Sequence, residues 1–181
     1  MTRTKFLIAA LTTPLLASGF AHADSLAVSS PDLAPGEQIK TEQVYSGSGC
    51  SGGNISPALT WSGAPAGTKS FAATLFDPDA PGGGFWHWLV FNIPATATGL
   101  AKGDGAATGK VGTQLVNGWG ATGYGGPCPP TGGGAHGYVL TVYAVDQDAL
   151  ALPANAQPAD LLVALNGHIL AKATLTATYG R

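Results

Sequence analysis

The chain has 181 residues and a net charge of −2, with only 10% Asp, Glu, Lys and Arg but 27 glycines and 13 prolines. A mildly acidic chain of this kind lacks the basic face that nucleic acid requires and the polybasic patch that binds a membrane surface. We therefore expect neither nucleic acid nor an integral membrane contact among its partners.

The first 23 residues predict a secretory signal peptide. Arg3 and Lys5 form a positive n-region, the run from Phe6 to Ala21 is almost wholly apolar or small, and Ala21-His22-Ala23 fits a small-x-small cleavage site. Cleavage after Ala23 would leave residues 24–181 as a single domain, 158 residues long, with a net charge of −4 because both basic residues are lost. The mature protein is then expected in the periplasm or outside the cell.

The rest of the chain predicts a fold dominated by β-strands. Short runs rich in Val, Thr, Tyr and Phe, separated by glycine and proline, predict strands at 25–30, 69–76, 88–93, 138–145 and 173–179. The run 138–145 is apolar on both faces and should lie between two packed layers. One convincing helix opens at Pro158 and closes at Asn166-Gly167. We expect a β-sandwich with Greek-key connections, one C-terminal helix and few other short helices.

Two long glycine-rich segments, 46–53 and 118–134, are predicted to lie outside the core as functional loops. In the second loop, Gly123 to Pro130 is expected to leave backbone N–H groups free to face a ligand, because amide-lined concavities bind anions.

An acidic, proline-stiffened loop is the most informative segment of the chain. Asp77-Pro78-Asp79-Ala80-Pro81 places two carboxylates one residue apart, and His87 follows within Phe85-Trp86-His87-Trp88. The combination predicts a pocket wall, with Phe85 and Trp86 at its mouth or in the core. The alternative is a β-turn whose Asp side chains bond neighbouring amides.

His136 and Tyr138 begin a strand and should point to the same face of it. An exposed loop histidine is the alternative for His136. If these two side chains meet Asp77, Asp79 and His87, they form a site for a small phosphate-like or carboxylate-like group. A carboxylate near a histidine raises the imidazole pKa, so the ring can present a protonated donor to an anion.

Three catalytic alternatives are weaker, and we predict no catalytic residue, no cofactor and no metal. Ser48 is the only glycine-flanked serine, and no Gly-x-Ser-x-Gly elbow is present. A metal site from Asp77, His87 and His136 has suitable ligand types but no supporting spacing. Asp77 and Asp79 are too close in sequence for the carboxylate pair of a glycoside hydrolase.

Cys50 and Cys128 are the only cysteines, and in an exported chain they predict a disulfide. Two free buried thiols are the alternative, and two thiols without a close histidine pair are a poor zinc signature.

These residues resemble the phosphatidylethanolamine-binding protein family, also called Raf kinase inhibitor-like proteins, in its bacterial YbhB/YbcL branch. The matching stretches span nearly the whole mature domain in the family's order: Cys50 to Pro57, Pro65 to Phe71, Asp77 to Pro81, Trp86 to Pro94, Gly123 to Pro130, and His136 with Tyr138.

The resemblance implies a β-sandwich with a small cavity for phosphate, acetate or a phosphoryl headgroup. By the same resemblance the cavity would use the following residues: Asp77, Asp79, Pro81, His87, His136 and Tyr138, with backbone groups around Pro127 and Cys128. It also implies a cis Ala80–Pro81 bond and a non-enzymatic binding or inhibitory protein. Gly137 departs from the family, which usually has Arg there, so we expect the loss of a supporting ion pair rather than of a ligand contact.

Two functions remain open at this point. The first is a secreted protein that binds a small anionic or phosphorylated ligand. The second is an interaction protein, with a protease or kinase-type partner, that acts as an inhibitor or signalling modulator through the glycine-rich loops around Ser46 and Gly123.

Overall fold

The computed structural model describes residues 25–181, so the predicted signal peptide and its cleavage site lie outside the described residues. Two antiparallel sheets and one helix make up the regular structure of this part of the chain. No helix within 25–181 combines the length and the apolar character needed to cross a bilayer.

The smaller sheet has the strand order β1-β2-β5, from Ala27–Ser29, Leu59–Ser62 and Gly99–Leu100. The larger sheet has the order β6-β4-β3-β7-β8. Its strands, in chain order, are β3 Ser70–Asp77, β4 Phe85–Pro94, β6 Thr113–Gln114, β7 His136–Val145 and β8 Ile169–Tyr179, and the helix α1 is Pro158–Leu165. The predicted β-dominated sandwich with one C-terminal helix is confirmed.

All five predicted strands and the helix are present, but three strands begin earlier than predicted. β4 starts at Phe85 rather than Trp88, β7 at His136 rather than Tyr138, and β8 at Ile169 rather than Ala173. The short strands β2, β5 and β6 were not predicted, because two to four residues carry too little pattern to be recognised.

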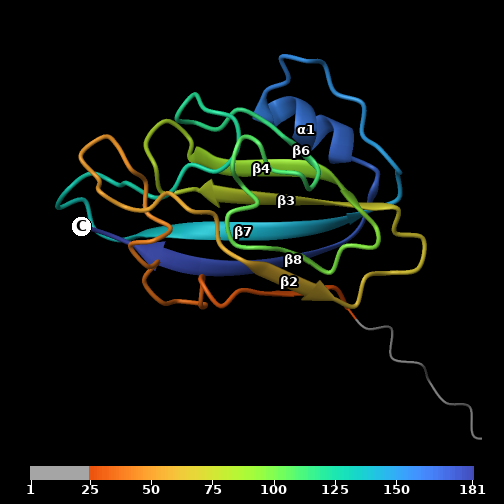
Figure 1. Cartoon of the computed structure of the whole chain (residues 1–181), viewed down its shortest axis with the longest axis horizontal. Helices are drawn as coiled ribbons and strands as arrows, with labels where there is room; N and C mark the ends of the chain where they lie inside the picture. Colours follow the sequence, from red (N-terminus) through yellow and green to blue (C-terminus); the bar gives the residue numbers. More distant parts are fainter. Residues whose placement is uncertain (1–24) are drawn as a thin grey trace, which may run out of the picture.

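The larger sheet packs against other elements on both faces. Because side chains alternate along its strands, neighbouring residues of β3 belong to different clusters. Phe71, Ala73 and Leu75 of β3 pack in one cluster with Trp61 of the smaller sheet. Ala72 points the other way, into a second cluster with Leu161 and Leu165 of α1. Figure 1 shows α1 beside β4 and β6 at one edge of the view and β2 below β8.

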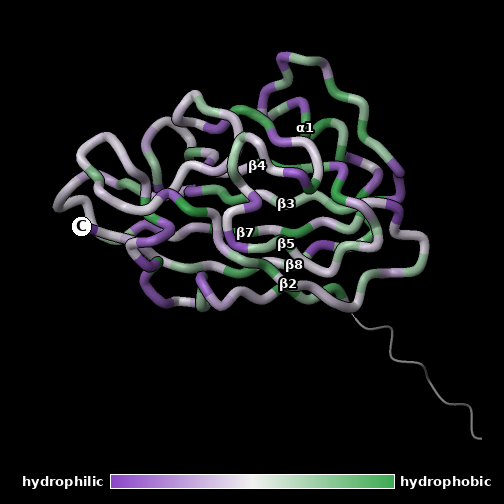
Figure 2. Tube along the Cα trace, viewed as in Figure 1, coloured by the Kyte–Doolittle hydropathy of each residue, from purple (hydrophilic) through white to green (hydrophobic). Residues whose placement is uncertain are grey.

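One end of the sandwich gathers the segments that carry the predicted site residues. β3 ends there at Asp77, while β4 and β7 begin there at Phe85 and His136, because neighbouring strands are antiparallel. In Figure 1 these loops lie at the left, beside the C-terminus. Figure 2 shows them mostly pale or purple, whereas green segments are frequent along the strands.

The prediction that the whole 118–134 loop lies outside the core is wrong for residues 123–127, which are buried. Glycine makes this possible, because a Cβ at Gly126 would collide with the carbonyl oxygen of Gln43. The buried amides are satisfied within the protein: Gly125 N–H donates to the His87 carbonyl and Gly126 N–H to Asn54 Oδ1, both at 2.8 Å. These glycines therefore serve packing rather than leaving N–H groups free for a ligand.

Candidate ligand-binding cavity

A cavity of about 150 Å³ lies at the loop end of the sandwich, where β3, β4 and β7 meet. It brings together six of the residues predicted from the sequence: Asp77, Pro81, His87, Cys128, His136 and Tyr138. Its remaining lining residues are Ala80, Phe85, Trp119, Pro129 and Pro130. Asp79 and Pro127 do not line it. That these residues bind a ligand stays a prediction.

Asp77 is buried and anchors the acidic loop. Its Oδ1 accepts N–H bonds from Asp79 at 2.9 Å and Ala80 at 3.1 Å, while Oδ2 lies 2.8 Å from His136 Nδ1. The β-turn alternative and the pocket prediction are therefore both correct for Asp77, because Oδ1 closes the turn and Oδ2 orients His136. Strand β3 ends at Asp77 and so holds its carboxylate at the cavity.

Asp79 is exposed and does not line the cavity. Its Oδ2 accepts the backbone N–H of Gly137 at 2.7 Å, so it ties the acidic loop to the start of β7. A Cβ at Gly137 would lie 3.5 Å from this oxygen, in ordinary contact. The backbone N–H of residue 137 therefore holds Asp79 without any side chain at that position.

His87 reaches the cavity through a β-bulge in β4. Leu75 of β3 pairs with Trp88, but the next residue, Phe76, pairs with Trp86, so His87 is the extra residue. Trp88 packs in the core between the sheets, and strict alternation would turn His87 to the opposite face. The bulge lets His87 point to the same side as Trp88 and line the cavity.

The His87 ring is held as a neutral imidazole. Its Nδ1 lies 2.6 Å from the carbonyl oxygen of Gly125, which can only accept, so Nδ1 carries the proton. Burial is the main cause that lowers the pKa of His87 from 6.5 to about 4, and the Gly125 carbonyl offsets this only in part.

The burial of His87 predicts a pH-dependent stability. Between pH 6.5 and about 4, the His87 side chain is protonated in the unfolded chain but not in the folded protein. The contribution of His87 to the free energy of unfolding is therefore fully present above pH 6.5 and is lost as the pH falls towards 4. The expected loss reaches roughly 3 kcal/mol for this one group. Urea unfolding of the parent and of His87→Gln at several pH values measures it.

The dependence of the free energy of unfolding on pH between 4 and 6.5 should be weaker in His87→Gln than in the parent. Tyr124→Phe, which removes a group that does not titrate there, should keep the parent slope. A parent whose stability between pH 4 and 6.5 matches that of His87→Gln would contradict a buried neutral imidazole.

Tyr138 and His136 lie side by side from β7, as the strand alternation predicted. The Tyr138 side chain is fully buried, and its hydroxyl has no hydrogen-bond partner among the described residues. Burial, together with the nearby Asp77 carboxylate, raises the pKa of Tyr138, so its hydroxyl stays protonated. His136 is buried as well, so it is not an exposed loop histidine.

An aromatic wall closes one side of the cavity, and only part of it was predicted. Phe85 lies 4.8 Å from the His87 ring and 4.7 Å from Trp119, between ring centroids. Trp119 stacks on Tyr45 at 4.2 Å, and its Nε1–H donates to the Gly126 carbonyl. An aromatic residue between Gly118 and Gly120 was the available signal for this residue.

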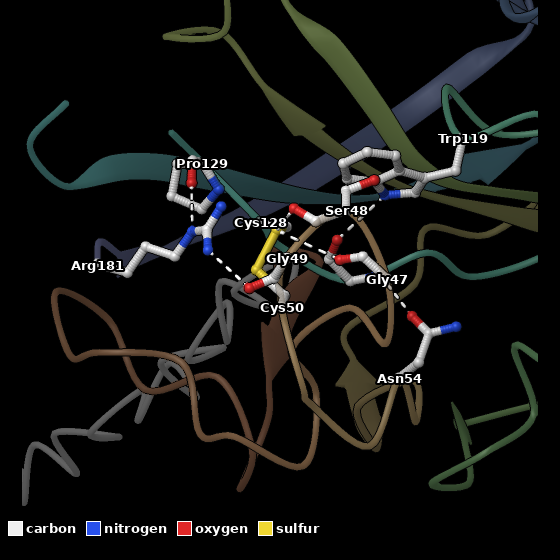
Figure 3. Close-up of a disulfide and its surroundings, with 10 residues drawn as sticks. Gly47, Ser48, Gly49, Cys50, Asn54, Trp119, Cys128, Pro129 and Arg181 are labelled. Atoms are coloured by element: carbon white, nitrogen blue, oxygen red, sulfur yellow. Dashed lines mark hydrogen bonds between the residues drawn. A yellow bond between two sulfur atoms is a disulfide. The ribbon is translucent and has the colours of Figure 1, made fainter. Parts of the chain in front are cut away.

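The predicted disulfide joins the two glycine-rich loops at the cavity rim. Cys50 and Cys128 are bonded, so the free-thiol alternative is wrong. Figure 3 shows the disulfide beside Arg181, whose guanidinium bridges both loops through the carbonyl oxygens of Gly49 and Pro129. The disulfide fixes Cys128 where it can line the cavity.

The cis Ala80–Pro81 bond implied by the family resemblance is wrong, since the peptide bonds of the described residues include no cis bond. The turn is closed instead by Asp77 Oδ1, which accepts the Asp79 and Ala80 amides, and by the Gly84 N–H, which donates to the Ala80 carbonyl.

Alternative chemistries gain no support from the described part of the chain. Within residues 25–181, no three His, Cys, Asp or Glu side chains come together at metal-binding distances. Each cavity histidine already uses Nδ1, His87 on Gly125 and His136 on Asp77.

Comparison with known proteins identifies the family. The family model for phosphatidylethanolamine-binding protein matches residues 29–180. The chain belongs to the phosphatidylethanolamine-binding protein family. YbcL of Escherichia coli K12 is 46% identical over 164 residues, covering 88% of this chain and 90% of the relative. Its crystal structure, described as that of a new member of the mammalian family, gives a TM-score of 0.83 at 44% identity and covers 87% of this chain and 99% of that one.

A third family member is the putative lipoprotein LppC of Mycobacterium tuberculosis. It is 38% identical over 161 residues, which covers 87% of this chain and 73% of the relative. Membership confirms the resemblance found in the sequence and makes this chain a binding protein of the phosphatidylethanolamine-binding, or Raf kinase inhibitor, type.

Proposed function

We propose that the cavity binds a small oxyanion, either free phosphate or the phosphoryl part of a headgroup such as phosphoethanolamine, without transforming it. The observation that carries the proposal is the Tyr138 hydroxyl, a buried donor near the Asp77 carboxylate that makes no hydrogen bond of ordinary geometry within residues 25–181, at a cavity that two histidines also line. Buried donors are almost always paired with protein, water or ligand, so an unpaired one beside a cavity points to an occupant.

The size of the cavity supports a small occupant. Its volume of about 150 Å³ has room for several water molecules. Pockets for drug-sized molecules are roughly 300–1,000 Å³, so a complete phospholipid does not fit inside. A headgroup could enter while its acyl chains stay outside.

The charges of the cavity fit an oxyanion when His136 is doubly protonated. The imidazolium then lies between the Asp77 carboxylate, 2.8 Å from Nδ1, and the anion, which would accept from Nε2. Tyr138 adds a second donor from the same strand face. The serine-hydrolase alternative needs an activated serine beside a base, and Ser48 is not among the lining residues.

Replacing Tyr138 with Phe tests the proposal, because only the hydroxyl is removed. We expect the affinity for inorganic phosphate and phosphoethanolamine to fall at least about tenfold, the cost of losing one buried donor to a charged ligand. The stability of the empty protein should stay the same or rise by up to about 1 kcal/mol, because an unpaired buried group is removed. Isothermal titration calorimetry and urea unfolding measure the two effects.

Tyr124→Phe is a matched control. Tyr124 is also buried, and burial raises its pKa, but its hydroxyl donates to the Gln43 carbonyl at 2.7 Å and does not line this cavity. This variant should lose about 1 kcal/mol of stability and keep the parent affinity. If the parent binds neither ligand, or if Tyr138→Phe binds both as well as the parent, the proposed function fails.

We also propose that the protein works outside the cytoplasm, in the periplasm or after secretion, once a signal peptide is cleaved after Ala23. The Cys50–Cys128 disulfide supports this, since disulfides persist mainly in oxidising compartments. The relative LppC, a putative lipoprotein by name, points the same way. Mass spectrometry of the protein purified from the periplasm would give its N-terminus directly.

A further inference from the structure

We propose that His87 makes the cavity select oxyanions that carry a proton, so that phosphate, phosphomonoesters and phosphonates in their singly protonated forms bind in preference to sulfate and sulfonates. The inference rests on the proposed function and deepens it, because it assigns His87 the role of a hydrogen-bond acceptor that determines which oxyanion binds.

The geometry of His87 fixes which ring atom faces the ligand and with which polarity. Nδ1–H is committed to the Gly125 carbonyl at 2.6 Å. The one side-chain hydrogen bond of His87 within residues 25–181 is made by Nδ1, so Nε2 is not committed, and the ring lines the cavity. In a neutral imidazole with the proton on Nδ1, Nε2 offers only a lone pair. His87 therefore accepts a hydrogen bond from the occupant and cannot donate one.

The surroundings of His87 keep the ring in that form. Phe85, Trp119 and Tyr138 place aromatic rings 4.8, 6.3 and 5.2 Å from the imidazole, between centroids. Burial disfavours the imidazolium more strongly than the Asp77 carboxylate on β3 favours it, and His136 on β7 would repel a second positive charge when protonated.

The polar groups of the cavity differ in what they offer a ligand. Tyr138 donates, His136 Nε2 donates only when the ring is doubly protonated and accepts otherwise, and His87 Nε2 only accepts. None of the described lining residues is Lys or Arg, so the ionised Asp77 is the one permanent charge. A dianion would add two negative charges beside Asp77 with only His136 to balance them. A singly protonated phosphoryl group carries one negative charge and can use its P–OH to donate to His87 Nε2.

Sulfate offers no such proton near neutral pH. Its oxygen would face the His87 lone pair with a lone pair of its own, so Nε2 would make no hydrogen bond to the ligand. Sites that hydrogen-bond a ligand OH reject analogues that lack it, because a buried polar group then loses its partner.

Methylphosphonate and methanesulfonate form a matched pair of probes. Below the second pKa of methylphosphonate both are monoanions of nearly the same shape, and only the phosphonate carries an acidic O–H. One pH unit below that pKa, the parent protein should bind methylphosphonate at least about tenfold more tightly than methanesulfonate in isothermal titration calorimetry. Equal affinities, or a preference for methanesulfonate, would overturn the inference while leaving the proposed oxyanion function intact.

The pH dependence separates the proton of the ligand from those of the protein. Methanesulfonate has no proton to lose, so the pH dependence of its affinity reports only the titratable groups of the protein. Above its second pKa, methylphosphonate should lose about tenfold in affinity per pH unit beyond whatever methanesulfonate loses. Parallel profiles for the two probes would also overturn the inference.

His87→Gln supplies the residue-level test, because an amide can turn either its NH₂ or its oxygen to the ligand. The variant should bind both probes within about threefold of each other, and retained selectivity would exclude His87 as its cause. If the variant does not fold, the parent comparison decides alone. Failure of the parent to bind phosphate, phosphoethanolamine or either probe would instead count against the proposed function.

Discussion

Replacing Cys50 and Cys128 together with serine is expected to lower the free energy of unfolding by about 4 kcal/mol. The two residues are 78 apart in sequence, and a closed loop of that length removes much conformational freedom from the unfolded chain. For a domain of this size, the loss corresponds to a fall in melting temperature of roughly 10 °C. Differential scanning calorimetry of the oxidised parent and the double-serine variant measures it.

The same substitution should weaken ligand binding, since the disulfide holds together the two loops at the cavity rim. Arg181 makes a second link between them through the carbonyls of Gly49 and Pro129. Arg181→Gln is therefore a control for loop linkage without loss of the covalent bond, and it should cost about 1 kcal/mol. A double-serine variant that melts within about 2 °C of an oxidised parent would contradict the structural role of the disulfide.

Strand and helix signals in the sequence were sufficient for the architecture. The runs at Tyr138–Val145 and Ser70–Asp77 are long and apolar, and the helix has proline at its start and glycine after its end, so local pattern and tertiary packing agree. The short strands of the smaller sheet could not be found in this way, because two-residue Gly99–Leu100 is a strand only through its pairing with β2.

Most of the residues that line the cavity were predicted from the sequence, but the backbone geometry that brings them there was not. The sequence placed Asp77, His87 and His136 at the ends of predicted strands and made their meeting a condition for the site, and in the structure all three line one cavity. The β-bulge that turns His87 inward depends on the pairing register with β3, which no local signal reveals. The burial of residues 123–127 was missed for a related reason. Glycine-rich sequence is typical of exposed loops, and here it allows close approach to the backbone of Gln43.

The two carboxylates of Asp77-Pro78-Asp79 look equivalent in the sequence, and the structure gives them different tasks. Asp77 is buried and accepts from two amides and His136, whereas Asp79 is exposed and accepts from one amide. We expect Asp77→Ala to lower the free energy of unfolding by about 3–5 kcal/mol, because removing one member of a buried, hydrogen-bonded pair leaves its partners unpaired. Asp79→Ala should cost about 1 kcal/mol.

Asp77→Ala should also weaken phosphate binding more than Asp79→Ala does. Without Asp77, His136 loses the acceptor that orients its ring and balances its positive charge, so phosphate affinity should fall at least about tenfold in calorimetry. Asp79→Ala should change it less than about threefold, because Asp79 does not line the cavity. Equal losses of stability or affinity from the two substitutions would mean that the acidic loop acts as a single charged turn. Unequal losses in the stated order would show that burial, and not the charge of the motif, decides which carboxylate supports the site.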